Sequence, residues 1–212
     1  MSEFSLNEIH VTAKKAARGA GYPWGLAEEA GQAVRWLCAQ GLDGCAALAG
    51  VLKRFDGVEL DRITPDTSKE IWKLEDKQVL CPLIVGAAMS DRANELRHRS
   101  FETSSVAEPS LLFAFAAYCA RRIECNVSVE WSNGTATSDG ERLSIEGQPG
   151  SIVEHICVQR GGKLLNPNKN CSRSNPEQST WETLNGFAHR TYAPATEESR
   201  LKGAGAEMVD RE

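Results

Sequence analysis

Residues 109–140 read PSLLFAFAAYCARRIECNVSVEWSNGTATSDG, and this stretch decides the fold class. The first half, from Pro109 to Ile123, is apolar on almost every side, which is typical of a helix buried on several faces. The second half alternates apolar and polar residues from Val127 to Trp131, the pattern of a half-buried strand. Asn133-Gly134 then predicts a hairpin, because a type I′ turn requires a positive φ at both central residues. The stretch predicts a buried helix packed on an antiparallel sheet.

The residues around this stretch extend the sheet. Asp139-Gly140 repeats the hairpin signal, and residues 142–145 and 152–158 are expected to complete an antiparallel meander. Residues 161–177 are rich in Asn, Ser, Lys and Pro and predict a long loop, followed by a short amphipathic helix over residues 179–188. Upstream, the short apolar run 79–85 favours a buried strand, with Pro82 at a sheet edge or a strand end.

The N-terminal part of the chain has helical signals. Ser5 and Glu8 have the spacing of a capping box, and apolar residues then recur at helical intervals until Gly19 to Gly21. A second helix is expected to end at Gly41, and a third covers residues 44–55. The fold class is therefore α+β, with an N-terminal three-helix unit (1–56), an α+β body with an antiparallel sheet (57–200) and a flexible tail (201–212).

Composition excludes several functional classes. The chain has 212 residues and a formal net charge of -5, so no global positive field exists to hold a phosphate backbone and no nucleic-acid partner is expected. The apolar runs are shorter than the roughly 20 residues that a membrane span requires, and the N-terminus does not resemble a signal peptide. The seven cysteines show no C-x-x-C pair and are expected to be small buried side chains. A soluble, cytoplasmic protein without a membrane partner is predicted.

Specific cofactor and metal motifs are absent from the sequence. It contains no P-loop, no G-x-G-x-x-G after a strand and no H-E-x-x-H. The four histidines are widely separated, so no spacing suggests a metal site. We therefore expect neither a cofactor nor a metal ion.

The first candidate segment joins two helices by a glycine-framed turn that carries Tyr22 and Trp24. Cations precede this turn and a pair of glutamates follows it. A ligand carboxylate is expected to meet Lys14 or Arg18, with one of the two glutamates as a general base. The alternative is structural, because glutamates in a first helical turn stabilise the helix dipole and exposed lysines form a solvated face.

Two further segments could hold an anion. Arg190, Tyr192 and Arg200 lie in a polar region near the C-terminus, where arginine can grip a carboxylate and tyrosine can donate a hydrogen bond to it. The alternative there is a strap held by surface ion pairs. Ser104 and Ser105 precede the helix that starts near Glu108-Pro109, and could bind an anion at its N-terminus or simply cap it.

These segments combine into one site hypothesis around a small anionic metabolite. The predicted catalytic residues are Glu28, Glu29 and Tyr192, and the predicted ligand-binding residues are Lys14, Arg18, Tyr22, Trp24, Arg190, Arg200, Ser104 and Ser105. The predicted function is a cytoplasmic, cofactor-independent enzyme that acts on a small carboxylate-bearing metabolite by proton transfer or elimination. The alternative is a non-catalytic small-molecule-binding or assembly subunit. A helix apolar on every side also suggests a homodimer that buries it.

Two motifs carry a family resemblance. They are residues 14–29, KKAARGAGYPWGLAEE, and residues 191–197, TYAPATE. With them, the sequence resembles an uncharacterised proteobacterial family known only as a domain of unknown function, over nearly the whole chain. The resemblance implies no activity, cofactor or site residue.

Overall fold

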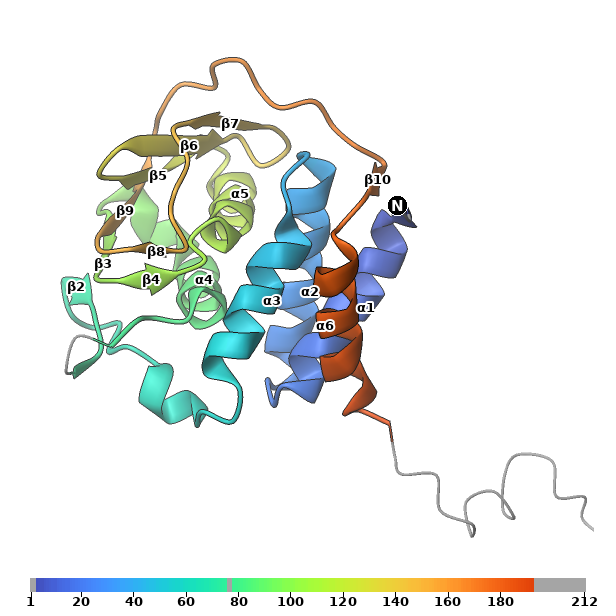
Figure 1. Ribbon diagram of the computed structural model, residues 1–212. Helices are drawn as coiled ribbons and strands as arrows, with labels where there is room; N and C mark the ends of the chain where they lie inside the picture. Colours follow the sequence, from blue (N-terminus) through green and yellow to red (C-terminus); the bar gives the residue numbers. More distant parts are fainter. Residues whose placement is uncertain (1–2, 76–77, 193–212) are drawn as a thin grey trace, which may run out of the picture.

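The computed structural model describes residues 3–75 and 78–192. Its helices are α1 Leu6–Gly19, α2 Trp24–Ala39, α3 Gly44–Phe55, α4 Pro82–Asp91, α5 Leu111–Ile123 and α6 Gln178–His189. Its strands are β1 Phe4–Ser5, β2 Ile71–Trp72, β3 Phe101–Thr103, β4 Val106–Ala107, β5 Val127–Trp131, β6 Gly134–Ser138, β7 Leu143–Glu146, β8 Ile152–Val153, β9 Ile156–Arg160 and β10 Arg173–Ser174. Figure 1 shows three layers: the sheet, then α4 and α5, then α1, α2, α3 and α6. The fold is α+β, as the sequence predicts.

The main sheet has the strand order β2-β3-β9-β5-β6-β7. The hairpin near Asn133-Gly134 is confirmed, because β5 and β6 pair antiparallel with Trp131 opposite Gly134. The predicted type I′ turn is wrong: the two loop residues are Ser132 and Asn133, and neither Asn133 nor Gly134 has a positive φ. The sheet departs from the expected meander after β7, because the expected strand 152–158 is divided and β8 pairs with β4 in a separate two-stranded sheet. Strand β9 does not pair with β7 but returns to the other side of β5, so that β5 becomes a central strand. Strand β2 pairs parallel to β3 and makes the sheet mixed.

Helix α5 is the centre of the core, as its apolar sequence predicts. It packs on β5 and β6 on one side and on α2 and α4 on the others. Phe113 and Phe115 are buried within this one chain, and Tyr118 is half-buried. The apolar surface of α5 therefore needs no partner chain to cover it. Dimerisation itself stays a prediction.

The outer helical layer combines the two ends of the described chain (Figure 1). Its first helix begins at the expected capping box: the Glu8 N–H donates to Ser5 Oγ over 3.2 Å, and the Ser5 N–H donates to the Glu8 carboxylate over 2.8 Å. Helix α6 packs against α1 and α3, far from both in sequence. The division of the chain at residue 56 stays a prediction, and the tail at 201–212 lies outside the described residues.

The strand expected over residues 79–85 is wrong. Pro82 starts α4 instead, in the first helical turn, where its missing N–H costs no hydrogen bond. Gly86 then allows α4 to approach α5 closely, because a Cβ at this position would overlap the ring of Phe115. The run is a helix because this contact buries it on several sides, and its short apolar sequence cannot distinguish such a helix from a buried strand.

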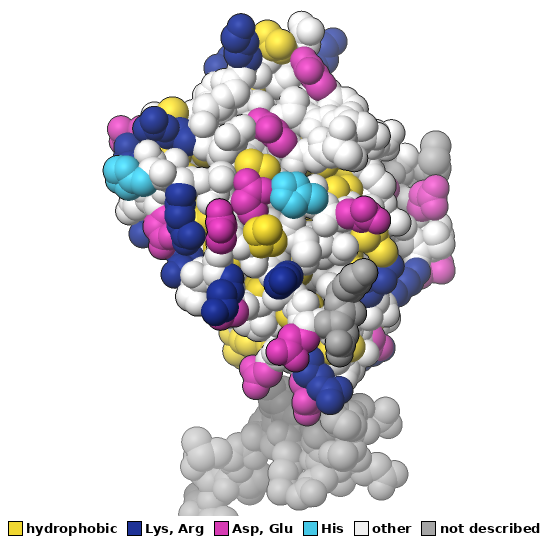
Figure 2. All heavy atoms as spheres, turned by 90° about the vertical axis from the view of Figure 1, so that its left-hand side faces the viewer, with side chains coloured by type: hydrophobic (Ala, Val, Ile, Leu, Met, Phe, Trp, Pro, Cys, Tyr) yellow, Lys and Arg dark blue, Asp and Glu magenta, His cyan; other side chains and the backbone are white. Residues whose placement is uncertain are grey.

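The surface on the sheet side carries both signs of charge. Figure 2 shows lysine and arginine side chains interspersed with aspartate and glutamate over the described residues of this face. Within the described residues, no helix combines the length and the apolar character that crossing a membrane requires.

Candidate functional site

Glu108 has an unusual backbone conformation at the junction between the layers. It lies between β4 and α5 with a φ of 41°, in the left-handed region that residues other than glycine seldom adopt. Its N–H donates to the Ser151 carbonyl over 2.7 Å, and its carbonyl accepts from the Leu111 N–H over 3.1 Å. Such a conformation costs on the order of 1–3 kcal/mol and persists only where the surroundings enforce it, most often at functional sites.

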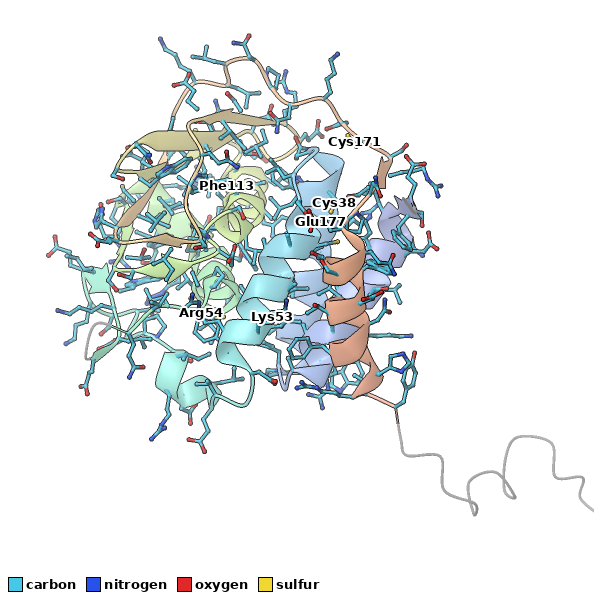
Figure 3. The ribbon with its side chains drawn as sticks, in the orientation of Figure 1. Cys38, Lys53, Arg54, Phe113, Cys171 and Glu177 are labelled. Carbon is cyan, nitrogen blue, oxygen red and sulfur yellow. The ribbon has the colours of Figure 1, made fainter. Side chains whose placement is uncertain are left out.

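The Glu108 carboxyl group is half-buried against α3. It sits directly over Gly50, where an added Cβ would lie 2.6 Å from Glu108 Oε1. No described residue forms a hydrogen bond or an ion pair with this carboxyl group; Arg54, one turn further along α3 (Figure 3), attracts it only from a distance. Burial raises the pKa of Glu108, and the attraction of Arg54 offsets this only in part.

A cleft of about 490 Å³ opens beside this carboxyl group, between the helical layer and the sheet. The volume lies within the range of about 300–1,000 Å³ that is usual for small-molecule sites. Its apolar walls come from α2, α3, α5 and β7, and its polar rim comes from the loops at their ends. The apolar lining residues are Leu37, Leu42, Ala46, Ala47, Phe113, Ile145 and Pro149, and the polar ones include Asp43, Glu108, Ser110, Gln148, Ser151 and Asn168.

A second carboxylate, Asp43, lines the same cleft. It is the N-cap of α3, and its Oδ1 accepts the Ala46 N–H over 2.9 Å. This bond fixes Asp43 in a structural role. None of the described residues that line the cleft is lysine or arginine. The cleft therefore combines apolar walls, one carboxylate held by the backbone and one carboxyl group with a raised pKa.

Two residues of the first candidate segment, Lys14 and Glu28, are paired with each other. Glu28 on α2 forms an ion pair with Lys14 Nζ on α1 at 2.5 Å, and lies 3.1 Å from His10 Nε2. The hydrogen bond from Lys14 lowers the pKa of Glu28, with a smaller contribution from Gln32. The structure thus brings Lys14 and Glu28 together, as an ion pair between helices.

The aromatic turn is also held internally. Arg18 donates to the Tyr22 carbonyl over 3.0 Å, and its guanidinium lies 5.0 Å from the centroid of the Trp24 ring. Tyr22 is 2% exposed, shares a hydrogen bond of 3.4 Å with Cys81 Sγ, and has a pKa raised chiefly by burial. Trp24 is 64% exposed. Arg18 and Trp24 are accessible to a ligand on this surface, whereas the Tyr22 hydroxyl is buried.

Glu29 has the raised pKa expected of a glutamate in a partly apolar setting. Burial is the main cause, and the negative charge of Asp91 adds to it. Its Oε2 atom is buried without a hydrogen-bond partner among the described residues. Glu29 and Glu28 are adjacent in sequence, yet their pKa values shift in opposite directions because only Glu28 faces a lysine.

The C-terminal candidates Arg190 and Tyr192 lie beside α1 on the side of α6, not on the side of α2. Arg190 forms a two-fold ion pair with Asp56, at 2.6 and 3.0 Å, and packs beside Gly19. The centroid of the Tyr192 ring lies 5.6 Å from Lys15 Nζ and 5.3 Å from the centroid of the His189 ring. The structure brings these residues against α1 through α6, whereas Glu28 contacts α1 from α2. Arg200 lies outside the described residues.

Ser104 and Ser105 do not lie at a helix N-terminus, and this correction follows from the strands around them. They connect β3 and β4, and α5 begins only at Leu111. The Ser104 N–H donates to the Trp72 carbonyl over 2.9 Å, which extends the sheet. Both serines line a separate cavity of about 860 Å³, whose cations are Lys69 and Lys73.

Sequence reasoning missed the cleft and Glu108. The only local signal was the position of Glu108 before Pro109, and this position disfavours the right-handed helical region without indicating a site. The cleft is built from segments near residues 43, 108, 148 and 168, which no spacing rule connects. Among the described residues, no group of three His, Cys, Asp or Glu side chains is placed to hold a metal ion.

Comparison with known proteins assigns no activity. A family model described as "Protein of unknown function (DUF3726)" matches residues 4–75, about a third of the chain. This match supports, over that part, the resemblance to a domain of unknown function. No curated protein matches. The malate dehydrogenase from Entamoeba histolytica is similar in structure, with 12% identity and a TM-score of 0.37 over 76% of this chain and 49% of that one. This chain spans about half the length of that protein, and the likeness is too weak to support a function.

Proposed function

We propose that the protein is an enzyme that transfers a proton on a small metabolite bound in the interlayer cleft, with Glu108 as the general base and without a bound cofactor. One combination of observations carries the proposal. Glu108 is half-buried, its carboxyl group has no partner among the described residues, and it is held in a strained conformation at the edge of a cleft of suitable size. A carboxyl group with a raised pKa is a better proton acceptor than an ordinary one once it ionises, which suits a general base.

The lining of the cleft favours a neutral or cationic ligand. Asp43 and Glu108 would repel an anion, and no lysine or arginine among the described lining residues would offset them. The apolar wall from α5 and β7 suits a ligand with a hydrocarbon part. The carboxylate-bearing metabolite expected from the sequence therefore remains a prediction for the surface around Lys14 and Arg18, where cations are present.

The alternative is a small-molecule-binding protein without catalysis. One observation favours it: Asp43 is committed to capping α3, so Glu108 alone would have to accept the proton and return it. Both alternatives place the protein in the cytoplasm. The cysteines support this location, since all seven lie within the described residues and are free thiols.

The test begins with ligand-induced stabilisation. Wild type, Glu108→Gln and the control Glu59→Gln are screened by thermal shift against a library of amines, neutral metabolites and carboxylates. Glu59 is a suitable control because its side chain is 84% exposed and does not line the cleft. A cleft ligand stabilises wild type and Glu59→Gln equally by mass action, and Glu108→Gln alters the size of that stabilisation without abolishing it. Ligands that stabilise all three proteins equally would show that the cleft is not their site.

Proton transfer is then measured directly. Each stabilising ligand is incubated with the protein in heavy water, and exchange of its C–H protons is followed by NMR. General-base catalysis contributes about 10²–10⁴-fold, so Glu108→Gln should slow the exchange by that factor while ligand binding persists. Binding at the cleft without any exchange by wild type would favour the non-catalytic alternative.

A further inference from the structure

Two buried cysteines meet where α2 turns into α3. Cys38 lies in the last turn of α2 and Cys45 in the first turn of α3, and their thiol groups form a hydrogen bond with each other. The contact follows from the close packing of the two helix ends. A Cβ added to Gly44 would lie 2.8 Å from the Val34 carbonyl oxygen and 3.0 Å from Leu37 Cβ, so α3 begins directly against α2. The fold thus holds two thiols side by side.

Three donors surround the sulfur of Cys38. They are the thiol of Cys45, the side chain of Ser174 on β10 and the backbone N–H of Gly44, the first residue of α3. Hydrogen bonds to a thiolate favour ionisation. These bonds, chiefly the one from Cys45, lower the pKa of Cys38 to about 7, although burial and the Asp43 carboxylate oppose them. The bond to Cys38 and burial raise the pKa of Cys45. Cys38 is therefore the thiol of the pair that ionises first.

Two other buried cysteines show the contrast. Burial raises the pKa of Cys81 and raises that of Cys119 to about 12. Cys81 Sγ lies 3.4 Å from the Tyr22 hydroxyl, and Cys119 Sγ donates to the Met89 carbonyl over 3.5 Å. Each therefore stays protonated beside a group that cannot form a disulfide. Thiols of this kind are inert, because the thiolate is the reactive form.

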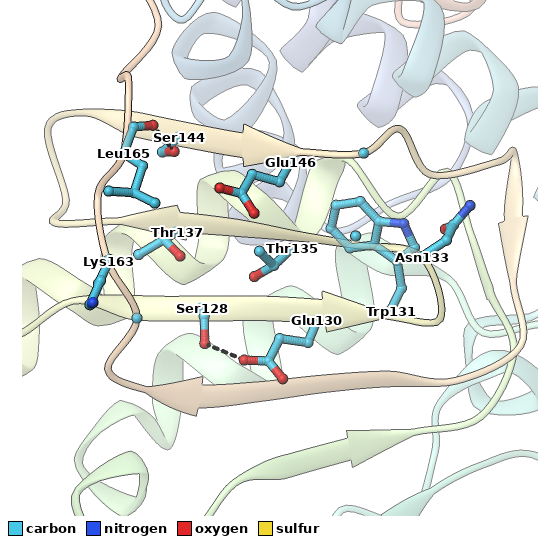
Figure 4. Close-up of a pocket in the computed structure, with 13 residues that line it drawn as sticks. Ser128, Glu130, Trp131, Asn133, Thr135, Thr137, Ser144, Glu146, Lys163 and Leu165 are labelled. Carbon is cyan, nitrogen blue, oxygen red and sulfur yellow. Dashed lines mark hydrogen bonds between the residues drawn. The ribbon is translucent and has the colours of Figure 1, made fainter.

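Residues 161–172 join β9 to β10 and form the cover of the pair. Figure 4 shows the first part of this segment, at Lys163, crossing the outer face of the sheet. The segment then reaches the end of α2, where the Cys171 N–H donates to the Ala39 carbonyl over 2.7 Å. Figure 3 shows Cys171 and Cys38 at this same end of α2. The segment thus ends over the turn that holds the two thiols.

The cover consists of exposed chain. Cys38 and Cys45 are 1% and 0% exposed, and the Ser174 side chain that contacts Cys38 follows the segment in β10. Residues 169–173, directly before Ser174, are exposed, so few apolar contacts hold them in place. Exposed segments of this kind open locally without unfolding of the domain. Such an opening lets a molecule as small as hydrogen peroxide reach Cys38.

We propose that Cys38 and Cys45 are a redox-active pair, which a small hydroperoxide oxidises reversibly to a disulfide. The proposal rests on the contact between the two thiols, on the donors around Cys38 and on the exposed cover. Disulfides of cytosolic proteins are usually transient and redox-sensing or catalytic, which agrees with seven free thiols in the reduced protein. The pair is separate from the chemistry proposed for Glu108, because neither cysteine lines the interlayer cleft.

The oxidation has two steps. The Cys38 thiolate attacks one oxygen of hydrogen peroxide, so that a sulfur–oxygen bond forms, the oxygen–oxygen bond breaks and hydroxide leaves to take up the proton that Cys38 released. Cys45 then loses its proton and attacks the sulfenic sulfur of Cys38, so that the disulfide forms and water leaves. The two thiols together lose two electrons, and the peroxide is reduced to two molecules of water. A dithiol reductant reverses the reaction by thiol–disulfide exchange.

The experiment uses the full chain, hydrogen peroxide and peptide mapping. Trypsin releases residues 36–53 as one peptide, which contains Cys38, Cys45 and no other cysteine. After treatment with peroxide at pH 7, iodoacetamide in denaturant blocks the thiols that remain. Wild type should give a peptide that carries no carbamidomethyl group and is lighter than the dithiol peptide by two hydrogen atoms. Dithiothreitol should restore both alkylated thiols.

Cys119 is the matched control, because it is 0% exposed but keeps its proton. At pH 7 the pair of Cys38 and Cys45 should lose its free thiols at least about tenfold faster than Cys119 does. Concentrated urea should abolish this difference, because the unfolded chain has neither the burial nor the hydrogen bonds that separate these thiols. A difference that persists in urea would contradict the proposal.

Cys45→Ser separates the two steps. Without the second thiol, oxidation should stop at a sulfenic acid on Cys38, which dimedone labels. The wild-type peptide map needs no variant and decides the outcome even where Cys45→Ser does not fold. The proposal is overturned if peptide 36–53 keeps both thiols at a peroxide concentration that oxidises the exposed Cys125, or if Cys38 becomes linked to Cys171 instead.

Discussion

A glutamate on the surface between α1 and α2 and a glutamate in the cleft between the layers have opposite electrostatic environments. Glu28 lies against Lys14 and His10, and its pKa is lowered. Glu108 is half-buried without an ion-pair partner among the described residues, and its pKa is raised. A paired carboxylate stabilises the native state, whereas an unpaired, partly buried one destabilises it when ionised. The difference separates a charge that stabilises the native state, on Glu28, from one that destabilises it, on Glu108.

The largest effect is expected from a substitution that fills the space now occupied by the Glu108 carboxyl group. In Gly50→Ala, the new Cβ would lie 2.6 Å from Glu108 Oε1, so the carboxyl group must move. The displaced atoms are the end of a flexible, half-buried side chain, so the cost should be at the low end for overpacking, about 1 kcal/mol in the free energy of unfolding, measured by urea denaturation. Ligand binding at the cleft should be lost as well.

Gly186→Ala on α6 is the matched control for this prediction. No atom lies within 4 Å of a Cβ at this helical position. Alanine should therefore stabilise the helix by about 0.5–1 kcal/mol. Equal changes in the free energy of unfolding of the two variants would mean that the Glu108 carboxyl group does not lie over Gly50.

Glu108→Gln should stabilise the protein at neutral pH. The folded-state pKa is raised above its ordinary value of 4.5, so ionisation costs more in the native than in the unfolded state. This cost is absent at low pH and increases as the pH rises through the folded pKa. Melting temperatures measured from pH 3 to pH 8 should show the gain of the variant appearing above pH 4.5 and vanishing below it. A variant less stable than wild type at pH 7 would refute the unpaired state of Glu108.

Glu28→Gln should show the opposite pH dependence, with a smaller effect. The folded-state pKa of Glu28 is lowered below its ordinary value of 4.5, so its contribution is present above that value and lost as the pH falls through the folded pKa. Partly exposed ion pairs contribute about 0.2–1 kcal/mol, and salt screens them. The loss should appear at pH 7 in low salt and shrink in high salt. A loss that persists at pH 3 would mean that packing, not charge, is responsible.

Arg190→Ala is expected to have the smallest effect on stability. Arg190 and Asp56 are exposed, and their mutual ion pair lowers the pKa of Asp56 and raises that of Arg190. The melting temperature should fall only slightly, close to that of the control Arg62→Ala, whose side chain is 78% exposed. If Arg190 holds a ligand carboxylate, as the sequence suggests, the variant should instead lose ligand-induced stabilisation. A large loss of stability would contradict both roles.

Local signals in the sequence predicted most of the elements. The capping box at Ser5, the hairpin that joins β5 and β6 and the amphipathic helix near the C-terminus are all found in the structure. These features depend on residues within a few positions of each other. Exceptions include the helix that begins at Pro82, the division of residues 152–158 between two sheets and the pairing of β9 with β5, and all three depend on contacts with distant residues.

The sequence by itself determined the α+β class, the buried character of α5 and the identity of the charged residues near Tyr22 and Arg190. Only the tertiary structure decided which charges are paired. Lys14 neutralises Glu28 because α1 and α2 are antiparallel neighbours, and Asp56 engages Arg190 because α6 returns to the N-terminal helices. It also decided that Glu108 has no such partner within residues 3–75 and 78–192. The electrostatic state of a carboxylate depends on its burial and on charges within a few ångström, and the chain brings those charges from remote positions only when it folds.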